Sequence, residues 1–232
     1  MSVKVLTQSK NYSFPTIPLL ENGDHLTREE FHRRYEAMPE NVKAELIKGV
    51  VYFRTRTKVS HGEANATIIG LIGLYSINLQ GTNFINHPTL IFDGKNEPQP
   101  DAVLRIEENY GGKSWVNDDD YLEGAPELIV EISSSTASYD LHDKLEIYEK
   151  KGVQEYIVWR VLDNQIDWFS LENDKYERLA PNKQGIIESK VFAGLRLNLK
   201  AMLDDDLLQV LADLQKGLQS KKYKFFSGHL SK

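Results

Sequence analysis

The sequence predicts a mixed α/β fold, in which helices flank a mixed sheet. The 232 residues are 41% hydrophobic and include 11 Tyr, 9 Phe and 3 Trp, which is enough to build a packed core. The apolar segments follow the order helix, strands, helix, strand, which is typical of such a domain. No phosphate-binding glycine loop of the dinucleotide or P-loop type is present, since Gly70 and Gly73 fall inside a helical pattern. Nucleotide-cofactor chemistry is therefore disfavoured.

The first elements follow a polar, extended arm that covers residues 1–22. A helix is predicted to begin after Thr27, because Thr27 and Glu30 have the spacing of a capping box. Residues 44–54 contain two short apolar runs about a Lys-Gly turn, which indicates a β-hairpin. Apolar residues at helical spacing in 61–80 then predict the longest helix of the protein.

From residue 84 onward the pattern changes to that of strands. The runs 84–92, 102–106 and 128–132 are apolar and β-branched, and Gly, Pro, Asn and Asp separate them. The run 128–132 is apolar enough to lie in the centre of the sheet. Residues 107–125, rich in Gly and acidic side chains, are predicted to form a loop.

The chain is predicted to end in a basic tail over 221–232. Because no repeat or low-complexity linker is visible, a single domain over 23–220 is the simplest organisation. The elements predicted in its second half are a helix over 141–151, a buried strand over 156–161, a β-meander over 165–199 and an amphipathic helix over 201–218.

Charge and composition exclude several classes of function. The chain has 28 Lys plus Arg and 34 Asp plus Glu, and a net charge of −6 argues against a protein that coats nucleic acid non-specifically. A nuclease with a locally basic groove remains compatible with this charge. The absence of cysteine excludes disulfide scaffolds, thiolate zinc sites, iron–sulfur clusters and cysteine nucleophiles. Since neither a secretory signal nor a membrane-spanning run is recognisable, a cytoplasmic location is expected.

Two carboxylates interrupt segments that are otherwise apolar. Asp101 stands at the head of the strand 102–106, and Glu131 lies inside the strand 128–132. A carboxylate in a central strand needs an ionic partner or a bound cation, and two on neighbouring strands repel each other unless positive charge lies between them. Hard divalent cations such as Mg²⁺ prefer such oxygen ligands. The alternatives are that Glu131 pairs with a nearby Lys or Arg and that Asp101 caps a turn.

A third feature is the helical face that Asp140, Lys144 and Tyr148 share at the spacing i, i+4, i+8. An ammonium placed over the two carboxylates could orient a water or stabilise charge that develops on a phosphate. The alternative is a solvated stripe with one ion pair. Lys144 is expected to be partly exposed and to contribute little to stability.

Several of these residues stand in a fixed order between residues 26 and 199. The segments are Glu45-Leu46-Ile47-Lys48-Gly49, His61 at a helix start, Pro100-Asp101, the run from Pro126 to Ser135, then Asp140, Lys144, Tyr148 and the run from Gly152 to Tyr156. In this order they resemble the Uma-type putative restriction endonuclease family. The resemblance implies the PD-(D/E)XK nuclease fold, a restriction-endonuclease-like mixed sheet flanked by helices. It also implies one Asp and one Glu that hold Mg²⁺, with Mn²⁺ as an alternative, for hydrolysis of DNA.

The resemblance assigns roles position by position. Asp101 matches the motif Asp and Glu131 the motif acid, so that both are metal ligands that share one cation. The motif Lys belongs two residues after Glu131, but Ser133 stands there. Lys144 on the following helix is suggested to supply the missing ammonium, which its long stem makes reasonable. The catalytic residues that the resemblance implies are Asp101, Glu131, Lys144, Glu45 as an additional acid and His61 facing the site.

The preferred function is a Mg²⁺-dependent DNA endonuclease, with a homodimer as one option and no membrane partner. One alternative is a catalytically inactive nuclease-like module that binds nucleic acid or protein. Another is a structural homo-oligomer whose interface contains Trp168 and Phe169 of the meander. Basic residues that could meet phosphate, each also compatible with ordinary solvation, are Lys43, Lys48, Arg54, Arg56, Lys58, Lys150 and Lys151.

Overall fold

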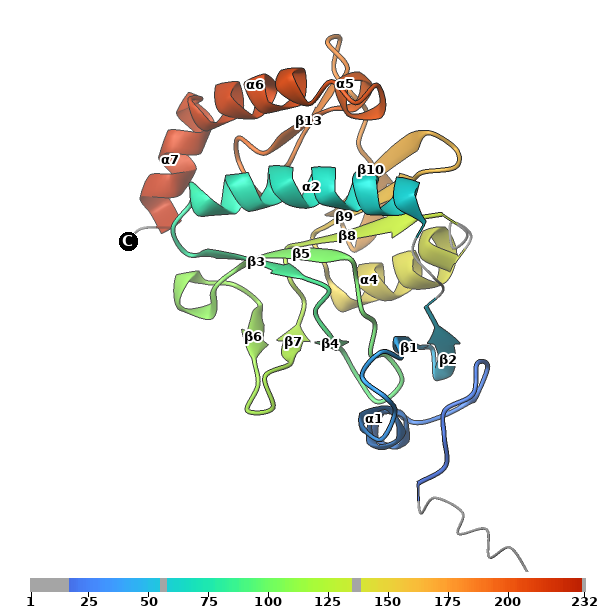
Figure 1. The fold of residues 1–232 in the computed structure, drawn as a ribbon. Coiled ribbons are helices and arrows are strands. Elements are labelled where there is room, and N and C mark those ends of the chain that lie inside the picture. Colours follow the sequence, from blue (N-terminus) through green and yellow to red (C-terminus); the bar gives the residue numbers. More distant parts are fainter. Residues whose placement is uncertain (1–16, 55–57, 135–138, 231–232) are drawn as a thin grey trace, which may run out of the picture.

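A six-stranded mixed sheet forms the centre of the computed structural model, which describes residues 17–54, 58–134 and 139–230 (Figure 1). The order is β11-β10-β9-β8-β5-β3; β8 and β9 run parallel, and the other neighbours are antiparallel. The strands are β3 (Thr82–Asn86), β5 (Ala102–Ile106), β8 (Leu128–Ser133), β9 (Glu155–Arg160), β10 (Gln165–Glu172) and β11 (Lys175–Arg178). The expected mixed α/β fold is confirmed.

Helices cover both faces of this sheet (Figure 1). On one face lies α2 (Val59–Ile77), whose buried side chains include Ile68, Ile72 and Tyr75 at the predicted helical spacing. On the other face lies α4 (Leu145–Lys151). Because side chains alternate along a strand, β8 and β9 supply apolar residues to a separate core on each face. Within the described residues, no helix is long and apolar enough to cross a membrane.

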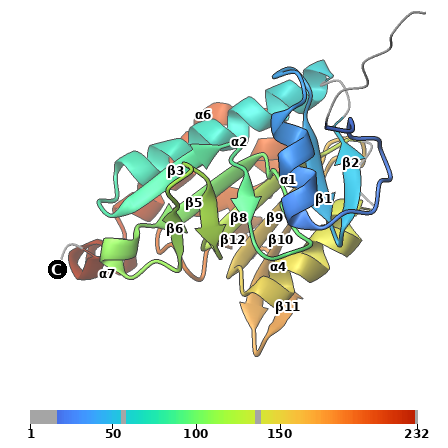
Figure 2. The same cartoon turned by 90° about the horizontal axis from the view of Figure 1, so that it is seen from below.

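The predicted hairpin and first helix are confirmed at one end of the molecule (Figure 2). The hairpin consists of β1 (Ala44–Ile47) and β2 (Val50–Phe53), and α1 (Arg28–Glu36) packs against it through a small core of its own. The side chain of Thr27 accepts a hydrogen bond from the Glu30 backbone N–H, as the capping-box spacing predicts. Two backbone hydrogen bonds between Leu46 and Glu97, of 2.8 and 3.1 Å, tie the hairpin to the segment that leads into β5.

The stretch 107–125 is not the loop that its composition predicts. It contains the 3₁₀ turn η1 (Glu108–Tyr110), β6 (Ser114–Val116) and β7 (Leu122–Gly124), and these two strands form a small sheet with β4 (Leu90–Ile91). The buried Glu127 carboxylate accepts hydrogen bonds from the backbone N–H groups of Ile106 and Lys113, which fixes the start of this stretch. Short strands of this kind depend on distant partners rather than on a local pattern.

The C-terminal part also differs from the predicted single helix and tail. The helix is divided into α5 (Leu199–Leu203) and α6 (Leu207–Leu218), because Asp205 adopts a positive φ of 58° and Asp206 caps α6. The meander ends in a separate pair, β12 (Ile186–Glu188) and β13 (Arg196–Asn198). Residues predicted as the basic tail form α7 (Lys221–Leu230), whose Tyr223 is only 9% exposed.

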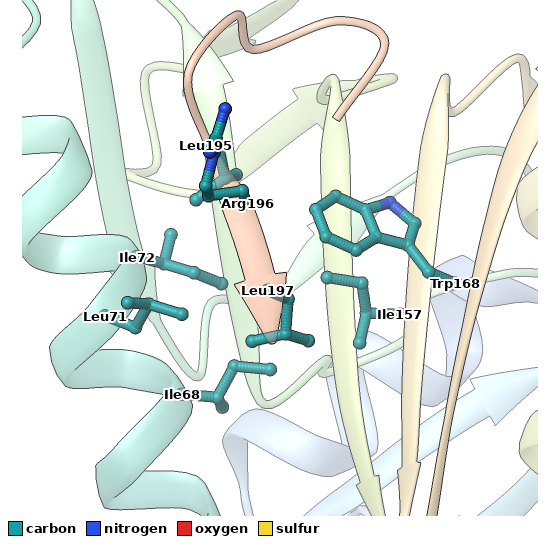
Figure 3. A pocket seen from close by; sticks show the side chains of 8 residues that line it. All are labelled: Ile68, Leu71, Ile72, Ile157, Trp168, Leu195, Arg196 and Leu197. Atoms are coloured by element: carbon teal, nitrogen blue, oxygen red, sulfur yellow. The ribbon is translucent and has the colours of Figure 1, made fainter. Parts of the chain in front are cut away.

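The core between α2 and the sheet is tightly filled. A residual cavity of about 10 Å³ is lined by apolar side chains of α2, β9, β10 and β13 and of Leu195, together with Arg196. Figure 3 shows these side chains. Trp168 points into this cavity and is 1% exposed. The hypothesis of a homo-oligomer interface that contains Trp168 is therefore wrong, because this side chain is already buried within one chain.

A buried acid at the start of β9 gives the fold a pH-dependent stability. Glu155 accepts hydrogen bonds of 2.6 Å from the Ser189 hydroxyl and from the Lys190 backbone N–H, which anchors the turn before β13 to the sheet. Burial raises the pKa of Glu155 from 4.5 to about 7, although these donors oppose the shift. The folded protein therefore binds a proton here between about pH 4.5 and 7 that the unfolded chain does not bind, so this group's contribution to stability falls as the pH rises through that window.

We predict that Glu155→Gln removes this pH dependence. Between pH 4.5 and 8, the free energy of unfolding of the wild type should fall relative to that of the variant by about 3 kcal/mol, since one pKa unit corresponds to about 1.4 kcal/mol. Urea unfolding at several pH values measures this difference. Glu177→Gln, at an exposed acid of β11, is the control: its free energy of unfolding should depend on pH as that of the wild type does. The prediction is contradicted if the free energy of unfolding of Glu155→Gln also has the wild-type pH dependence.

Candidate functional site

A pocket of about 840 Å³ is lined by residues of the hairpin, the start of α2, the segment before β5, the end of β8 and the segment before α4. Figure 1 shows where these elements lie. The side chains that surround it are mainly polar, ionisable or aromatic. The ionisable residues in its wall are Tyr35, Lys43, Glu45, Tyr52, Arg54, Lys58, His61, His87, Asp101, Glu131, Tyr139, Asp140 and Lys144. All five residues that the sequence analysis proposes as catalytic are among them.

Asp101 lies directly before β5, opposite Glu131 of β8. The antiparallel register pairs Ala102 with Val130, so the next pair outward is Asp101 and Glu131, on the face of the sheet that α4 covers. The Asp101 side chain is fully buried. Its Oδ2 accepts a hydrogen bond of 2.7 Å from the Ile132 backbone N–H. Its Oδ1 accepts one of 2.5 Å from Arg54 Nη2.

Lys144 connects three carboxylates. Its Nζ lies 2.8 Å from Glu131 Oε1, 3.0 Å from Glu45 Oε2 and 3.7 Å from Asp140 Oδ1. Tyr148 OH donates a second hydrogen bond, of 2.9 Å, to Glu131 Oε1. The predicted common face of Asp140, Lys144 and Tyr148 is therefore confirmed, although its first turn is the π-helical turn η2 (Asp140–Lys144).

The expectation that Lys144 is partly exposed is wrong. Its side chain is 2% exposed, because β1, β8 and η2 surround it. The aromatic ring of Tyr139 adds a cation–π contact, with 5.4 Å from Nζ to the ring centroid. The ammonium is thus a buried charge that only its carboxylate partners compensate, and not a solvated surface group.

Glu45 and His61 enter the pocket from opposite sides. Glu45, on β1, contacts Lys144 and also accepts a hydrogen bond of 3.2 Å from the Gln99 backbone N–H. His61 lies in the first turn of α2, with Nε2 4.0 Å from Asp101 Oδ2. Its Nδ1 is buried and has no hydrogen-bond partner among the described residues. These places agree with the expected ones, and the catalytic roles of both residues stay predictions.

Two residues of the site escape the sequence analysis. Arg54 was considered only as a possible phosphate contact, yet it binds Asp101, which lies 47 positions away in the sequence. His87 lies with Nδ1 3.5 Å from Asp101 Oδ1, and its backbone N–H donates to the Asp101 carbonyl at 3.1 Å. His87 has a positive φ of 50°, and no pattern in the sequence predicts this backbone conformation. Arg56, another proposed phosphate contact, lies outside the described residues.

The buried acids of the pocket outnumber the permanent cations that contact them. Four carboxylates, on Glu45, Asp101, Glu131 and Asp140, contact two permanent cations, Lys144 and Arg54. Burial raises the pKa of Glu131, even though Lys144 acts in the opposite direction. Burial alone would lower the pKa of Lys144, but the surrounding carboxylates hold it above its ordinary value. The site therefore favours an additional cation.

The side chains as they stand do not form a complete metal-binding cluster. Among the described residues, no three Asp, Glu or His side chains converge as ligands of one ion. Asp101 and Glu131 nevertheless line the same pocket from neighbouring strands. Mg²⁺ commonly takes one or two carboxylates and completes its shell with waters and substrate phosphate, so two such ligands suffice for it.

Comparisons with known proteins give a matching family model and a similar fold. The family model described as "Uma2: Putative restriction endonuclease" matches residues 28–200. The fold is similar to the crystal structure of a "putative nuclease belonging to DUF820" from Anabaena variabilis ATCC 29413, with a TM-score of 0.59 and 16% sequence identity, over 77% of this chain and 98% of that one. No curated protein sequence matches significantly. At this identity the structural likeness shows the fold, and the match to the family model agrees with the resemblance seen in the sequence.

We predict that Lys144→Ala lowers the free energy of unfolding by about 3–5 kcal/mol, because it leaves buried carboxylates without their cation. Urea unfolding near pH 8 measures this loss. Lys48→Ala is a suitable control, since Lys48 also contacts two acids, Asp143 and Glu146, but is 40% exposed; it should lose at most about 1 kcal/mol.

A second variant separates charge from packing. Combining Lys144→Met with Glu131→Gln removes one charge of each sign and should recover part of the stability that Lys144→Met alone loses. A Lys144→Ala protein that unfolds at the wild-type urea concentration would contradict the assignment of Lys144 as a structural counterion.

Proposed function

The chain belongs to the Uma2 family of putative restriction endonucleases, and from this membership we propose that it is a metal-dependent endonuclease that hydrolyses DNA phosphodiester bonds. The observation that carries the proposal is the pair Asp101 and Glu131, which face each other from neighbouring strands in an open pocket, with Lys144 bound to Glu131. Two acids and a lysine are the side chains that the PD-(D/E)XK resemblance implies, and such acids can hold a divalent cation that activates water. The lysine here comes from η2 and not from the strand position that Ser133 occupies.

The residues fit a hard divalent cation. Every carboxylate in the cluster offers oxygen ligands. The four acids outnumber the two permanent cations that contact them. Among the described contacts, both hydrogen bonds to Glu131 reach Oε1, so Oε2 is the oxygen that would bind the ion. Both oxygens of Asp101 accept a hydrogen bond, Oδ2 from the Ile132 N–H and Oδ1 from Arg54, so an ion bound there would share Asp101 with these partners or replace one of them. When bound, Mg²⁺ or Mn²⁺ lowers the pKa of a water and neutralises charge that develops on the phosphate.

The chain's own residues would position the reactants. Lys144 Nζ, fixed by Glu131 and Glu45, can donate its remaining hydrogen bond to the attacking water or to a phosphate oxygen. Glu45 acts mainly through Lys144, since it holds the ammonium in place. His61, beside Asp101, has the buried Nδ1 described above and can hydrogen-bond to substrate at the pocket.

Lys43 and Lys58 line the mouth of the same pocket and supply positive charge for the nucleic-acid backbone. This local charge is needed because the chain as a whole carries −6. Action on DNA is consistent with the cytoplasmic location expected from the sequence. The homodimer stays a prediction.

We predict Mg²⁺- or Mn²⁺-dependent cleavage of plasmid DNA that Asp101→Asn and Glu131→Gln each reduce at least about 100-fold, because each removes a charged ligand. Gel assays with each metal and with chelator measure the cleavage. Asp163→Asn and Glu188→Gln, at acids that are 51% and 40% exposed, serve as controls and should cleave normally. Circular dichroism must show that all variants are folded.

Two outcomes would reject this function. One is cleavage at the wild-type rate by both pocket variants. The other is the absence of cleavage of plasmid, duplex or single-stranded DNA by the wild-type protein with either metal. Binding of DNA without any cleavage would instead support the nuclease-like binding module.

We also predict that Lys43→Met combined with Lys58→Met weakens DNA binding and reduces the salt dependence of the binding constant. Each lost phosphate contact lowers the slope of log K against log salt by about 0.9, so the pair should lower it by about 1.8. Titration of a labelled duplex in chelator at several salt concentrations measures the slope. Lys183→Met combined with Lys200→Met removes the same charge from exposed positions outside the pocket wall and should leave it unchanged; equal slopes for both double variants would contradict the prediction.

A further inference from the structure

Arg54 reaches into the pocket from the residue after β2. Its Nη1 donates a hydrogen bond of 3.1 Å to the Gln99 carbonyl, and its Nη2 donates the bond of 2.5 Å to Asp101 Oδ1. The side chain remains 24% exposed, so one side of the guanidinium faces the open pocket. Arg54 therefore contacts a buried acid and is also accessible from the pocket.

The position of Arg54 conflicts with a metal ligand role for Asp101. The Ile132 N–H that binds Asp101 Oδ2 is fixed in the backbone of β8, whereas the Arg54 side chain can leave Oδ1, so Oδ1 is the oxygen at which a cation would replace an existing partner. A guanidinium and a divalent ion at one carboxylate oxygen repel each other strongly at such distances. A metal ion and Arg54 would therefore compete for Asp101.

The neighbouring histidines do not replace this charge. His87 Nδ1 lies 3.5 Å from Oδ1, farther than the 2.5 Å of Arg54 Nη2. His61 is more distant, at 4.0 Å from Oδ2. Arg54 is thus the permanent cation that contacts Asp101 in the described part of the chain.

Building on the nuclease function proposed above, we propose that Arg54 is a substrate-binding residue that stands in for the metal's charge on Asp101 until metal and nucleic acid bind, and then moves to a substrate phosphate. The planar fork of a guanidinium matches a phosphate as well as a carboxylate. A phosphate in the pocket can therefore bind the Arg54 guanidinium when the metal replaces Arg54 at Asp101.

This exchange couples the two ligands. Without nucleic acid, the metal must displace Arg54 from Asp101 into solvent, which weakens metal binding. With nucleic acid present, the displaced guanidinium gains a phosphate, so each ligand strengthens the binding of the other by the same factor. The protein would hold metal tightly only in the presence of its substrate.

The test measures Mn²⁺ binding to the full chain by calorimetry, without nucleic acid. Arg54→Met should bind Mn²⁺ at least about tenfold more tightly than the wild type, because the competing charge is gone. Arg54→Lys keeps the charge and should bind like the wild type. Arg33→Met removes the same charge from a side chain that is 48% exposed on α1, and it controls for the change in net charge.

A second measurement follows the coupling. A short phosphorothioate duplex, chosen because it resists cleavage, should bind the wild type more tightly in Mn²⁺ than in chelator. Arg54→Met should lose most of this gain. Arg54→Gln, which keeps a donor for the Gln99 carbonyl, should behave in the same way and replaces Arg54→Met if that protein is unstable.

The outcomes distinguish this inference from the proposed function. Equal Mn²⁺ affinity of the wild type, Arg54→Met and Arg54→Gln, with binding abolished by Asp101→Asn, would overturn the role of Arg54 and leave the metal-dependent nuclease intact. If Asp101→Asn binds Mn²⁺ as the wild type does, or if no protein binds it with or without the duplex, both the metal site and the inference are wrong.

Discussion

The buried ammonium of Lys144 determines how the pocket is arranged. It links Glu45 of the hairpin, Glu131 of the central strand β8 and Asp140 of η2, three segments that come from distant parts of the chain. Replacing such an ionic cluster by apolar side chains is often neutral or stabilising, so stability alone does not explain it. Its effect here is geometric, because one ammonium holds carboxylates of three distant segments within 3.7 Å of a single atom.

The fold was largely predictable where a local pattern exists. Helical spacing predicts α2, apolar β-branched runs predict β5 and β8, and Thr27 predicts the start of α1. The small sheet of β4, β6 and β7 was not predictable, since its strands are only two or three residues long and β7 pairs with Leu90 and Ile91 of a distant segment. The division between α5 and α6 depends on backbone conformation at Asp205 rather than on hydrophobic spacing.

The sequence alone indicates those site residues that interrupt an apolar strand pattern. Asp101 and Glu131 attract notice because acids are out of place in apolar strands, and both line the pocket. Glu45 and His61 could be found only through the family resemblance, since neither interrupts a pattern. The pairing of Arg54 with Asp101 could not be found, because it joins two positions through the fold alone. The burial of Lys144 was missed because helical spacing places residues on one face but does not say what covers that face.

The attachment of the hairpin has a mechanical consequence. Glu45 lies on its first strand and Arg54 directly follows its second, and the Arg54 N–H bonds to the Lys43 carbonyl at 2.8 Å. The two side chains that contact Lys144 and Asp101 therefore come from the same hairpin and the residue that follows it. Backbone hydrogen bonds of Leu46 with Glu97 and of Gly49 with Lys95 join this hairpin to the segment before β5. A displacement of the hairpin would therefore move the Glu45 carboxylate and the Arg54 guanidinium together and would change both contacts at once.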